Sequence, residues 1–267
     1  MKTLWLVGED VARSPSAAMH NAALAELRLD GLYTLHPTKR DDVDATFAEA
    51  ERACRGINVT APFKLAAARR YHGVLDDDAR AAGAVNTVVY GDDGAVQALD
   101  TDVAGLLFAW KRSGFHVEGK TLAVVGSGGA ARAVVVAAQQ AGARDLLVHA
   151  RRERGRSELI ACAERAGLPV VARGEPSLAV FAVTALDDVA GMIERVLPTR
   201  AAVHDLRYGM NARDLRDAAL RAGHLFADGS LMLLAQAQAA LAAFIGAPLP
   251  ERAAAAMRRA LTDALRE

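Results

Sequence analysis

The chain has 267 residues, few cysteines, few aromatic residues and no excess of charge of either sign. Its two cysteines, Cys54 and Cys162, lie far apart without a CxxC motif, which argues against a disulfide framework or a structural zinc site. Lys plus Arg and Asp plus Glu both number 32, so nucleic acid and anionic membranes are disfavoured as partners. The histidines are scattered singly, and no metal site is expected.

Long apolar runs are missing as well. The longest candidate, LMLLAQAQAALAAFIGA, carries two glutamines and falls short of the roughly 18 residues expected of a membrane helix. The amino terminus, MKTLWLVGED, turns acidic too early for the apolar region of a signal peptide. Hydrophobic residues nevertheless make up 52% of the chain, enough for a sizeable core. We therefore expect a soluble, cytoplasmic, globular protein.

Short apolar runs alternate with stretches of helical periodicity, the order that is typical of parallel α/β sheets. The first part predicts strands at 4–7, 32–35 and 56–59, helices at 17–29 and 43–53, and a hairpin at 85–90 and 95–99. A helix at 102–112 leads to a second series, with strands at 121–125, 145–149, 180–184 and 201–205 and helices at 129–140 and 157–166. Helices at 230–245 and 252–265 follow, and on spacing alone they could pack on either unit.

The sharpest local motif is VVGSGGAARA at 124–133, which joins a buried strand to a helix. Gly126 permits a tight turn, Gly128 lets the backbone approach a pyrophosphate, and the small Ala131 allows the helix to pack on the strand. The helix N-terminus offers free N–H groups and the positive end of its dipole. The motif therefore predicts a dinucleotide site on Gly126, Ser127, Gly128, Gly129 and Ala130. A glycine-rich turn without a ligand is the alternative.

The end of the next strand indicates which dinucleotide. The segment LVHARR at 147–152 has no acidic residue that could accept hydrogen bonds from the ribose of NAD. Arg151 and Arg152 suit a 2′-phosphate, because a guanidinium binds phosphate through paired, charge-assisted hydrogen bonds. NADP is therefore the expected cofactor, with NAD left open. The alternative is that both arginines form a solvated basic turn.

Polar residues also follow the predicted strands of the first part, where open α/β sheets bind ligands. Ser14 and Ser16 flank Pro15 and could hold a carboxylate, although Ser16 is equally suited to cap the following helix. Lys64 falls in the first turn of a helix with Pro62 near its first position. A lysine there opposes the helix dipole, which favours a functional role over a surface position.

Other polar residues have simpler interpretations. Asp102 opens the predicted helix at 102–112 and is most simply its N-cap, while Asp76 to Asp78 is most simply a solvated turn. Gln236 lies in an otherwise apolar helix. Because a buried amide without a partner costs about 1–3 kcal/mol, it needs a protein partner or a ligand.

Taken in order, these motifs resemble the shikimate dehydrogenase family over essentially the whole chain. The family has the motifs HSxSPxxHN, NVTxPxK, GAVNT, NTD, GAGGAARA, NRT, DxxY and GxxMLxxQ. In the same order, this chain has RSPS with the following HN, NVTAPFK, GAVNT, DTD, GSGGAARA, ARR, DLRY and GSLMLLAQ. The chain departs from this pattern where Arg13 replaces His, Ala17 replaces Pro, Asp100 replaces Asn and Ala150 replaces the Asn of NRT.

The resemblance implies a two-domain α/β enzyme. An αβ substrate-binding domain over 1–101, with the C-terminal helices 229–267 packing back on it, would accompany a Rossmann dinucleotide-binding domain over 102–228. The reaction would be reversible hydride transfer between NADP(H) and the 3-dehydroshikimate/shikimate pair, a step of aromatic amino acid biosynthesis. The protein would act on this small molecule as a monomer or homodimer, without nucleic acid or membrane.

The resemblance also implies residue roles. Lys64 and Asp102 would form the catalytic pair: the lysine protonates or stabilises the developing alkoxide, and the aspartate fixes its position. Opposite charges about 4 Å apart attract by roughly 4 kcal/mol at an effective dielectric of about 20. The substrate carboxylate would be held by Ser14, Ser16 and Tyr208, and the ring hydroxyls by Thr60, Asn86, Asp102 and Gln236.

The departures from the family pattern leave two alternatives open. Arg13 and Asp100 could shift substrate choice, so a family paralogue acting on quinate or another hydroxylated cyclic acid with NAD is one of them. The other is a non-catalytic nucleotide-binding protein, which would need neither Lys64 nor Asp102.

Overall fold

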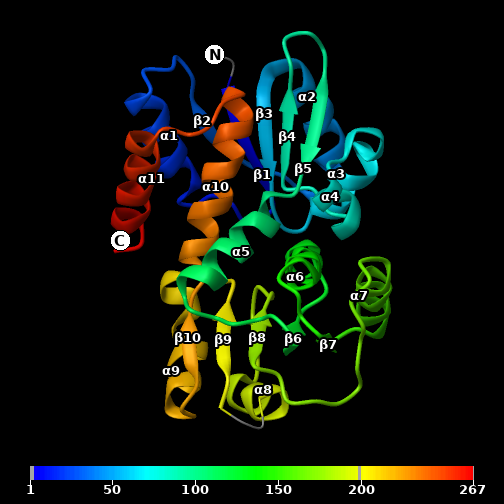
Figure 1. The fold of residues 1–267 in the computed structure, drawn as a ribbon. Helices are drawn as coiled ribbons and strands as arrows, with labels where there is room; N and C mark the ends of the chain where they lie inside the picture. The colour runs from blue at the N-terminus through cyan, green and yellow to red at the C-terminus, as the bar shows by residue number, and fades with distance from the viewer. Residues whose placement is uncertain (1–2, 198–199, 267) are drawn as a thin grey trace. The chain divides into compact units, whose positions relative to one another are not determined.

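The computed structural model describes residues 3–197 and 200–266, and the chain divides into two compact units. The first unit runs to Thr101 and resumes at Leu234, while the second comprises Asp102–Leu233. Each unit contains one five-stranded sheet (Figure 1). The predicted α/β class, with two such sheets in series, is confirmed.

The sheet of the first unit has the strand order β2-β1-β3-β4-β5. Its parallel strands are β1 (Thr3–Gly8), β2 (Tyr33–Pro37) and β3 (Cys54–Val59), and the expected antiparallel hairpin is β4 (Thr87–Tyr90) and β5 (Val96–Leu99). The helices between them are α1 (Ser16–Glu26), α2 (Val43–Ala53), α3 (Lys64–Arg70) and α4 (Asp77–Ala82), with short 3₁₀ turns at Arg40–Asp42 and His72–Val74. Trp5, Phe47 and Ile57 belong to the core between sheet and helices.

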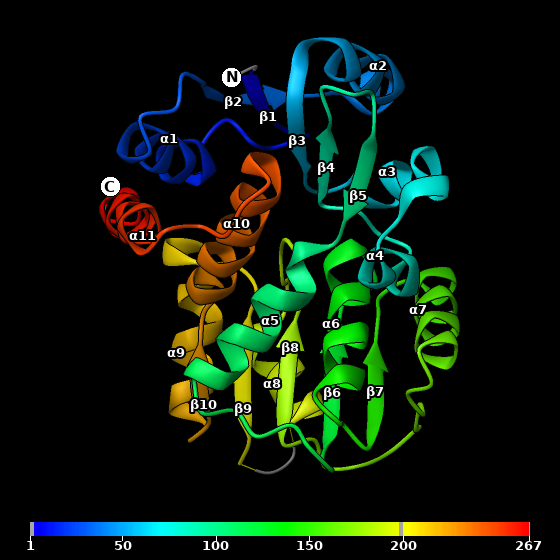
Figure 2. The same ribbon diagram turned by 45° about the horizontal axis from the view of Figure 1, so that its top comes forward.

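The C-terminal helices α10 (Ser230–Ile245) and α11 (Glu251–Ala264) return to this unit from Leu234 onward. α11 lies beside α1 in both views (Figures 1 and 2). Phe244 of α10 packs on β3 at Gly56, where any Cβ would overlap the phenyl ring, so only glycine fits. The expectation that the C-terminal helices pack on the first domain is confirmed.

The sheet of the second unit is entirely parallel, with the order β10-β9-β8-β6-β7 (Figure 2). Its strands are β6 (Thr121–Val125), β7 (Asp145–His149), β8 (Leu178–Phe181), β9 (Ala202–Asp205) and β10 (Leu225–Ala227). Its helices are α5 (Thr101–Arg112), α6 (Gly129–Gln140), α7 (Glu153–Arg165), α8 (Val189–Val196) and α9 (Arg213–Arg221), with a 3₁₀ turn at Gly209–Ala212. The first residue of α5, Thr101, still belongs to the first unit. The strand order reverses between β6 and β8, and such switch points are where open α/β sheets bind ligands.

Two expected helix caps are wrong. Ser16 is not an N-cap, because α1 begins at Ser16 itself and Pro15 occupies the capping position without a side-chain hydrogen bond. Asp102 is not one either, because α5 begins one residue earlier, at Thr101. Neither Ser16 nor Asp102 therefore occupies the N-cap position that the sequence suggested for it.

Pro62 and the acidic run are also corrected. Pro62 precedes α3 instead of opening it, because the Thr60–Phe63 segment turns back and the Phe63 N–H donates to the Thr60 carbonyl at 2.9 Å. Asp76 is the N-cap of α4, and its side chain accepts a hydrogen bond from the Ala79 N–H at 2.7 Å. The acidic run is thus the start of a helix.

The two cysteines, Cys54 and Cys162, are buried and are not joined by a disulfide bond. Over the part of the chain that the structure describes, no helix combines the length and apolar character needed to cross a bilayer.

Candidate active site

Asn86 is the centre of a buried polar cluster in the first unit. The Thr101 N–H donates to Asn86 Oδ1 at 2.9 Å, and because a backbone N–H can only donate, this contact identifies the amide oxygen. The Nδ2 group then faces Thr101 Oγ1 at 2.9 Å and Gln236 Oε1 at 3.4 Å. Gln236, carried by α10, therefore has a protein partner among the predicted site residues.

Asn58 and Thr87 lie behind Asn86 and orient it. Asn58 Nδ2 donates to Thr87 Oγ1 at 2.9 Å and to the Asn86 carbonyl at 3.2 Å. The Thr87 hydroxyl in turn donates to Asn86 Oδ1 at 2.9 Å. Neither residue is among the predicted site residues; the available signal was an asparagine inside the predicted strand at 56–59.

Ser14 and Ser16 lie together at the start of α1. Ser14 Oγ is 3.1 Å from Ser16 Oγ and accepts a hydrogen bond from the Ser16 N–H at 3.3 Å. The Ser16 carbonyl accepts from His20 Nδ1 at 2.9 Å, so His20 carries its proton on Nδ1. Complete burial lowers the pKa of His20 to about 4, which keeps the ring neutral. The adjacent hydroxyls have the spacing to bind one carboxylate.

Thr60 and Lys64 are anchored by their backbones. The Thr60 N–H donates to the Val7 carbonyl at 2.9 Å, and the Lys64 carbonyl accepts from the Val85 N–H at 3.0 Å. Lys64 is half-buried at the first residue of α3. Since Val85 immediately precedes Asn86, the first unit holds the lysine backbone next to the buried amide cluster.

In the second unit, the glycine-rich loop lies at the β6–β8 switch point. Gly126 has a φ of 126°, and any Cβ there would overlap the carbonyl oxygen of Ala182, just after β8. Gly128 is the N-cap of α6 in extended conformation, and a Cβ added there would enter open space. No side chain caps this helix, so its first N–H groups are available to a phosphate.

Arg132 adds a positive charge to this helix start. It is 8% exposed, and its Nε has no hydrogen-bond partner among the described residues, while Nη2 is 3.4 Å from Glu158. Sequence reasoning missed Arg132, although a lone arginine in an apolar helix was a visible signal. The open Gly128 position, the uncapped helix and this buried guanidinium together fit a bound dinucleotide phosphate.

Arg151 and Arg152 follow β7, the strand beside β6, and both are exposed. Arg151 Nη1 is 3.9 Å from Asp187 Oδ2, with the two side chains 81% and 93% exposed. Such an exposed pair contributes little, so its donors remain accessible to a phosphate.

Tyr208 lies just after β9 and is half-buried at the start of the 3₁₀ turn. The loop before it is fixed by Arg207, which bonds to the fully buried Asp205 at 2.8 Å and to Asp214 at 3.0 Å. Asp102 is buried in the first turn of α5.

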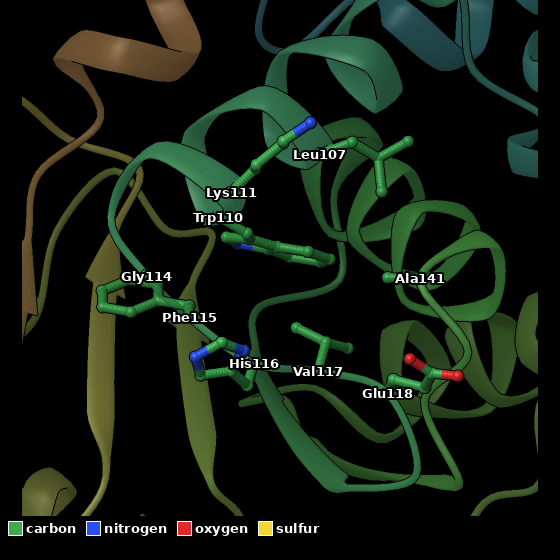
Figure 3. Close-up of a pocket in the computed structure, with 9 residues that line it drawn as sticks. All are labelled: Leu107, Trp110, Lys111, Gly114, Phe115, His116, Val117, Glu118 and Ala141. Atoms are coloured by element: carbon green, nitrogen blue, oxygen red, sulfur yellow. The ribbon is translucent and has the colours of Figure 1, made fainter.

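Two hollows lie away from these residues. One, of about 450 Å³, is lined by the end of α5 and the segment before β6, with the Trp110 ring across it and Val117 facing that ring (Figure 3). The other, of about 540 Å³, is lined by residues around Tyr71. Neither is lined by a predicted site residue. In the described ranges, no three His, Cys, Asp or Glu side chains are grouped to hold a metal.

The parallel sheet of the second unit, with a glycine-rich loop at its switch point, is Rossmann-like. The first unit contains a buried cluster of amides and hydroxyls, groups that can bind a polar ligand. Residues 6–88 match the family model of the shikimate dehydrogenase substrate binding domain. The chain belongs to the shikimate dehydrogenase family, as its whole-length relatives establish.

Among these relatives, the shikimate dehydrogenase (NADP(+)) of Thermus thermophilus is 36% identical over 96% of this chain and 97% of its own. That of Rubrobacter xylanophilus is 35% identical over 96% and 94%. A crystal structure of shikimate 5-dehydrogenase from Thermus thermophilus in complex with NADP(H) and shikimate has a TM-score of 0.79 and 34% identity, covering 97% of this chain and 100% of that one.

Proposed function

We propose that this protein is an NADP-dependent shikimate dehydrogenase, which interconverts 3-dehydroshikimate and shikimate by reversible hydride transfer. The observation that carries this proposal is the contact between Asn86 and Gln236, two motif residues that lie far apart in sequence but form one buried amide pair. A hydroxylated ring is the ligand class that such amides recognise, because each amide both donates and accepts.

The substrate is held, in this proposal, by the polar residues of the motifs. Ser14 and Ser16 bind its carboxylate with adjacent hydroxyls, and Tyr208 contributes a third. The ring hydroxyls are bound by Thr60, Asn86, Asp102 and Gln236. Because the amide orientations of Asn86 are fixed by Thr101 and Thr87, the site offers preset donors and acceptors.

Lys64 and Asp102 are the catalytic residues in this proposal. When the ketone is reduced, hydride reaches the carbonyl carbon and the oxygen gains a proton. Lys64 supplies that proton or stabilises the negative charge on the oxygen, and Asp102 is its acidic counterpart. In the reverse direction the same lysine accepts the proton from the substrate hydroxyl.

NADP(H) supplies the hydride when bound. Gly126, Ser127, Gly128, Gly129 and Ala130 would hold its pyrophosphate at the start of α6, and Arg151 and Arg152 its 2′-phosphate. Gly155 lets α7 approach the loop, since any Cβ at that position would overlap Ser127 Oγ.

A steady-state screen of shikimate and quinate, each with NADP and NAD, tests this function. We expect the highest kcat/KM with shikimate and NADP. Turnover mainly of quinate with NAD would favour the paralogue, and no turnover with any of the four pairs would favour a non-catalytic nucleotide-binding protein. A cytoplasmic setting and a monomeric or dimeric state remain parts of the same proposal.

Asp100 is one of the two departures from the family pattern near this site, with Arg13: it directly follows β5, precedes Thr101 and is 2% exposed. We expect Asp100→Asn to change the ratio of shikimate to quinate turnover by at least about threefold, the effect of one altered hydrogen bond. The kcat/KM values for both acids measure this ratio. An unchanged ratio would mean that Asp100 braces the adjacent turn and takes no part in substrate choice.

A further inference from the structure

A chain of side-chain hydrogen bonds runs through the first unit from Tyr33 to Gln236. The Tyr33 hydroxyl is 2.8 Å from Asn58 Oδ1, and Asn58 Nδ2 donates to Thr87 Oγ1 at 2.9 Å. The Thr87 hydroxyl donates to Asn86 Oδ1 at 2.9 Å, and Asn86 Nδ2 donates to Gln236 Oε1 at 3.4 Å. Each residue donates to the next, so Tyr33 is the first donor of the whole series.

The direction of this series is fixed. Burial raises the pKa of Tyr33 well above its ordinary value, so the phenol keeps its proton and donates. Asn58 Nδ2 also donates to the Asn86 carbonyl at 3.2 Å, and a carbonyl can only accept. Because Thr87 accepts from Asn58, its single proton is left for Asn86.

Tyr33 is itself held on three sides. Its backbone N–H donates to Asn21 Oδ1 at 2.8 Å and its carbonyl accepts from Asn21 Nδ2 at 3.0 Å. Its ring stacks on His20, with centroids 4.1 Å apart and planes 13° apart, and is 1% exposed. His20 in turn donates to the Ser16 carbonyl. Tyr33 thus contacts both His20, which bonds to Ser16, and Asn58, the next residue of the series that leads to Asn86.

Resting on the proposed function, we propose that Tyr33 is a positioning residue for the substrate. Through Asn58 and Thr87 it keeps the Asn86 oxygen turned inward, toward donors of the protein, and the Asn86 Nδ2 turned toward Gln236, where a ring hydroxyl is to be bound. Tyr33 does not touch the substrate in this arrangement, because Asn58 and Thr87 stand between it and Asn86.

Tyr33→Phe isolates this role, since it removes one oxygen and keeps the ring that stacks on His20. Asn58 then loses its donor and its amide is no longer held from that side. We expect KM for shikimate to rise about 3- to 10-fold, the range of one net hydrogen bond, with kcat within about twofold because Lys64 is unchanged.

Tyr90→Phe is the matched control. Tyr90 is also buried, at 6% exposure, and its hydroxyl is 2.8 Å from the Tyr71 hydroxyl, outside the series. The Tyr90→Phe substitution removes a buried phenol hydroxyl of the same unit, so KM for shikimate should stay at the wild-type value even if the melting temperature falls. Two variants of Thr87 test the next hydrogen bond in the series. Thr87→Val should raise KM as Tyr33→Phe does, while Thr87→Ser keeps the hydroxyl and should have the wild-type KM.

A double-mutant cycle tests whether Tyr33 acts through Asn86. Tyr33→Phe should raise KM no further in an Asn86→Ala background. Wild-type protein that turns over no shikimate with NADP would refute the proposed function. Active wild type with an unchanged KM in Tyr33→Phe, or additive effects in the cycle, would refute the positioning role. If Tyr33→Phe does not fold, equal KM values for Thr87→Val and Thr87→Ser would refute it.

Discussion

Lys64 occupies a costly position for a cation, the first residue of a helix, where the exposed N–H groups already present positive charge. Its backbone is tied to Val85, which fixes where the side chain starts. Such a placement is understandable if the ammonium meets negative charge that forms during a reaction.

We expect Lys64→Ala to lower kcat at least about 100-fold, the lower end for general acid–base catalysis, while KM changes only a few-fold. Lys64→Arg separates two roles: the guanidinium keeps the charge but does not release a proton near neutral pH. Steady-state kinetics with shikimate measure both variants. A kcat of Lys64→Ala within about threefold of wild type would remove the lysine from the mechanism.

Arg151 should set the cofactor preference. A charge-assisted contact to phosphate is worth about 1.5–3 kcal/mol, or tenfold and more in kcat/KM for NADP over NAD. Arg151→Ala should lose most of that preference, while Arg154→Ala, an arginine 91% exposed and paired with Glu158, should keep it. Equal use of both cofactors by the wild type would show that Arg151 points into solvent.

The sequence singled out individual polar residues of the site, but it did not predict which residues they bond to. Gln236 was expected to need either a protein group or a ligand, and the structure supplies Asn86. Tyr33 and Thr87 could not be singled out, because a tyrosine or threonine at a strand start is ordinary and only the folded sheet places their hydroxyls beside Asn58.

Among the elements, the loop before α6 contains two glycines, Gly126 and Gly128, and glycine is required at each for a different reason. Gly126 has no room for a side chain and a backbone that L-residues rarely adopt, whereas Gly128 borders open space. The first requirement belongs to the fold and the second to the ligand.

Gly126→Ala should therefore lower the melting temperature, because the new methyl overlaps the Ala182 carbonyl. Gly128→Ala should leave the melting temperature nearly unchanged but weaken NADP binding about tenfold or more, because its methyl occupies the space that a phosphate needs. Thermal unfolding and NADP titration separate the two. Unchanged NADP affinity in Gly128→Ala would place the phosphates elsewhere.

Elements with strong apolar signals were predicted well. β6, α6 and β7 have the predicted bounds, and α2 and α10 do too. β8 begins and ends earlier than predicted, and α7 begins four residues earlier, because its charged first turn, ERGR, hides the helical pattern. α8, α9 and β10 were missed; α9 is rich in charge, and β10 is a short edge strand that only pairing with β9 defines.

For the molecule as a whole, buried histidines link stability to pH. His204 is 1% exposed, and its Nδ1 accepts the Trp110 indole N–H at 3.1 Å. Burial lowers the pKa of His204 from 6.5 to about 4, against an opposing effect of Asp228. In the unfolded chain His204 therefore binds a proton below about pH 6.5, whereas in the folded protein it binds one only below about pH 4.

We expect the free energy of unfolding to fall as pH drops from 6.5 to 4, with about 3 kcal/mol of that fall due to His204. His204→Asn keeps an acceptor for Trp110 and should remove this share of the slope, whereas His116→Asn, at an exposed position of the same unit, is the control. Denaturant unfolding at several pH values measures it. The same slope in His204→Asn and wild type would contradict the prediction.

The return of the C-terminal helices to the first unit has a consequence for synthesis on the ribosome. The second unit is one continuous segment, while the first is completed by residues from Leu234 onward. Gln236 and Phe244, which contact Asn86 and cover Gly56, are therefore translated after every residue of the second unit. A nascent chain can complete the second unit while the polar cluster around Asn86 still lacks α10. The first unit, whose translation begins first, is therefore completed last.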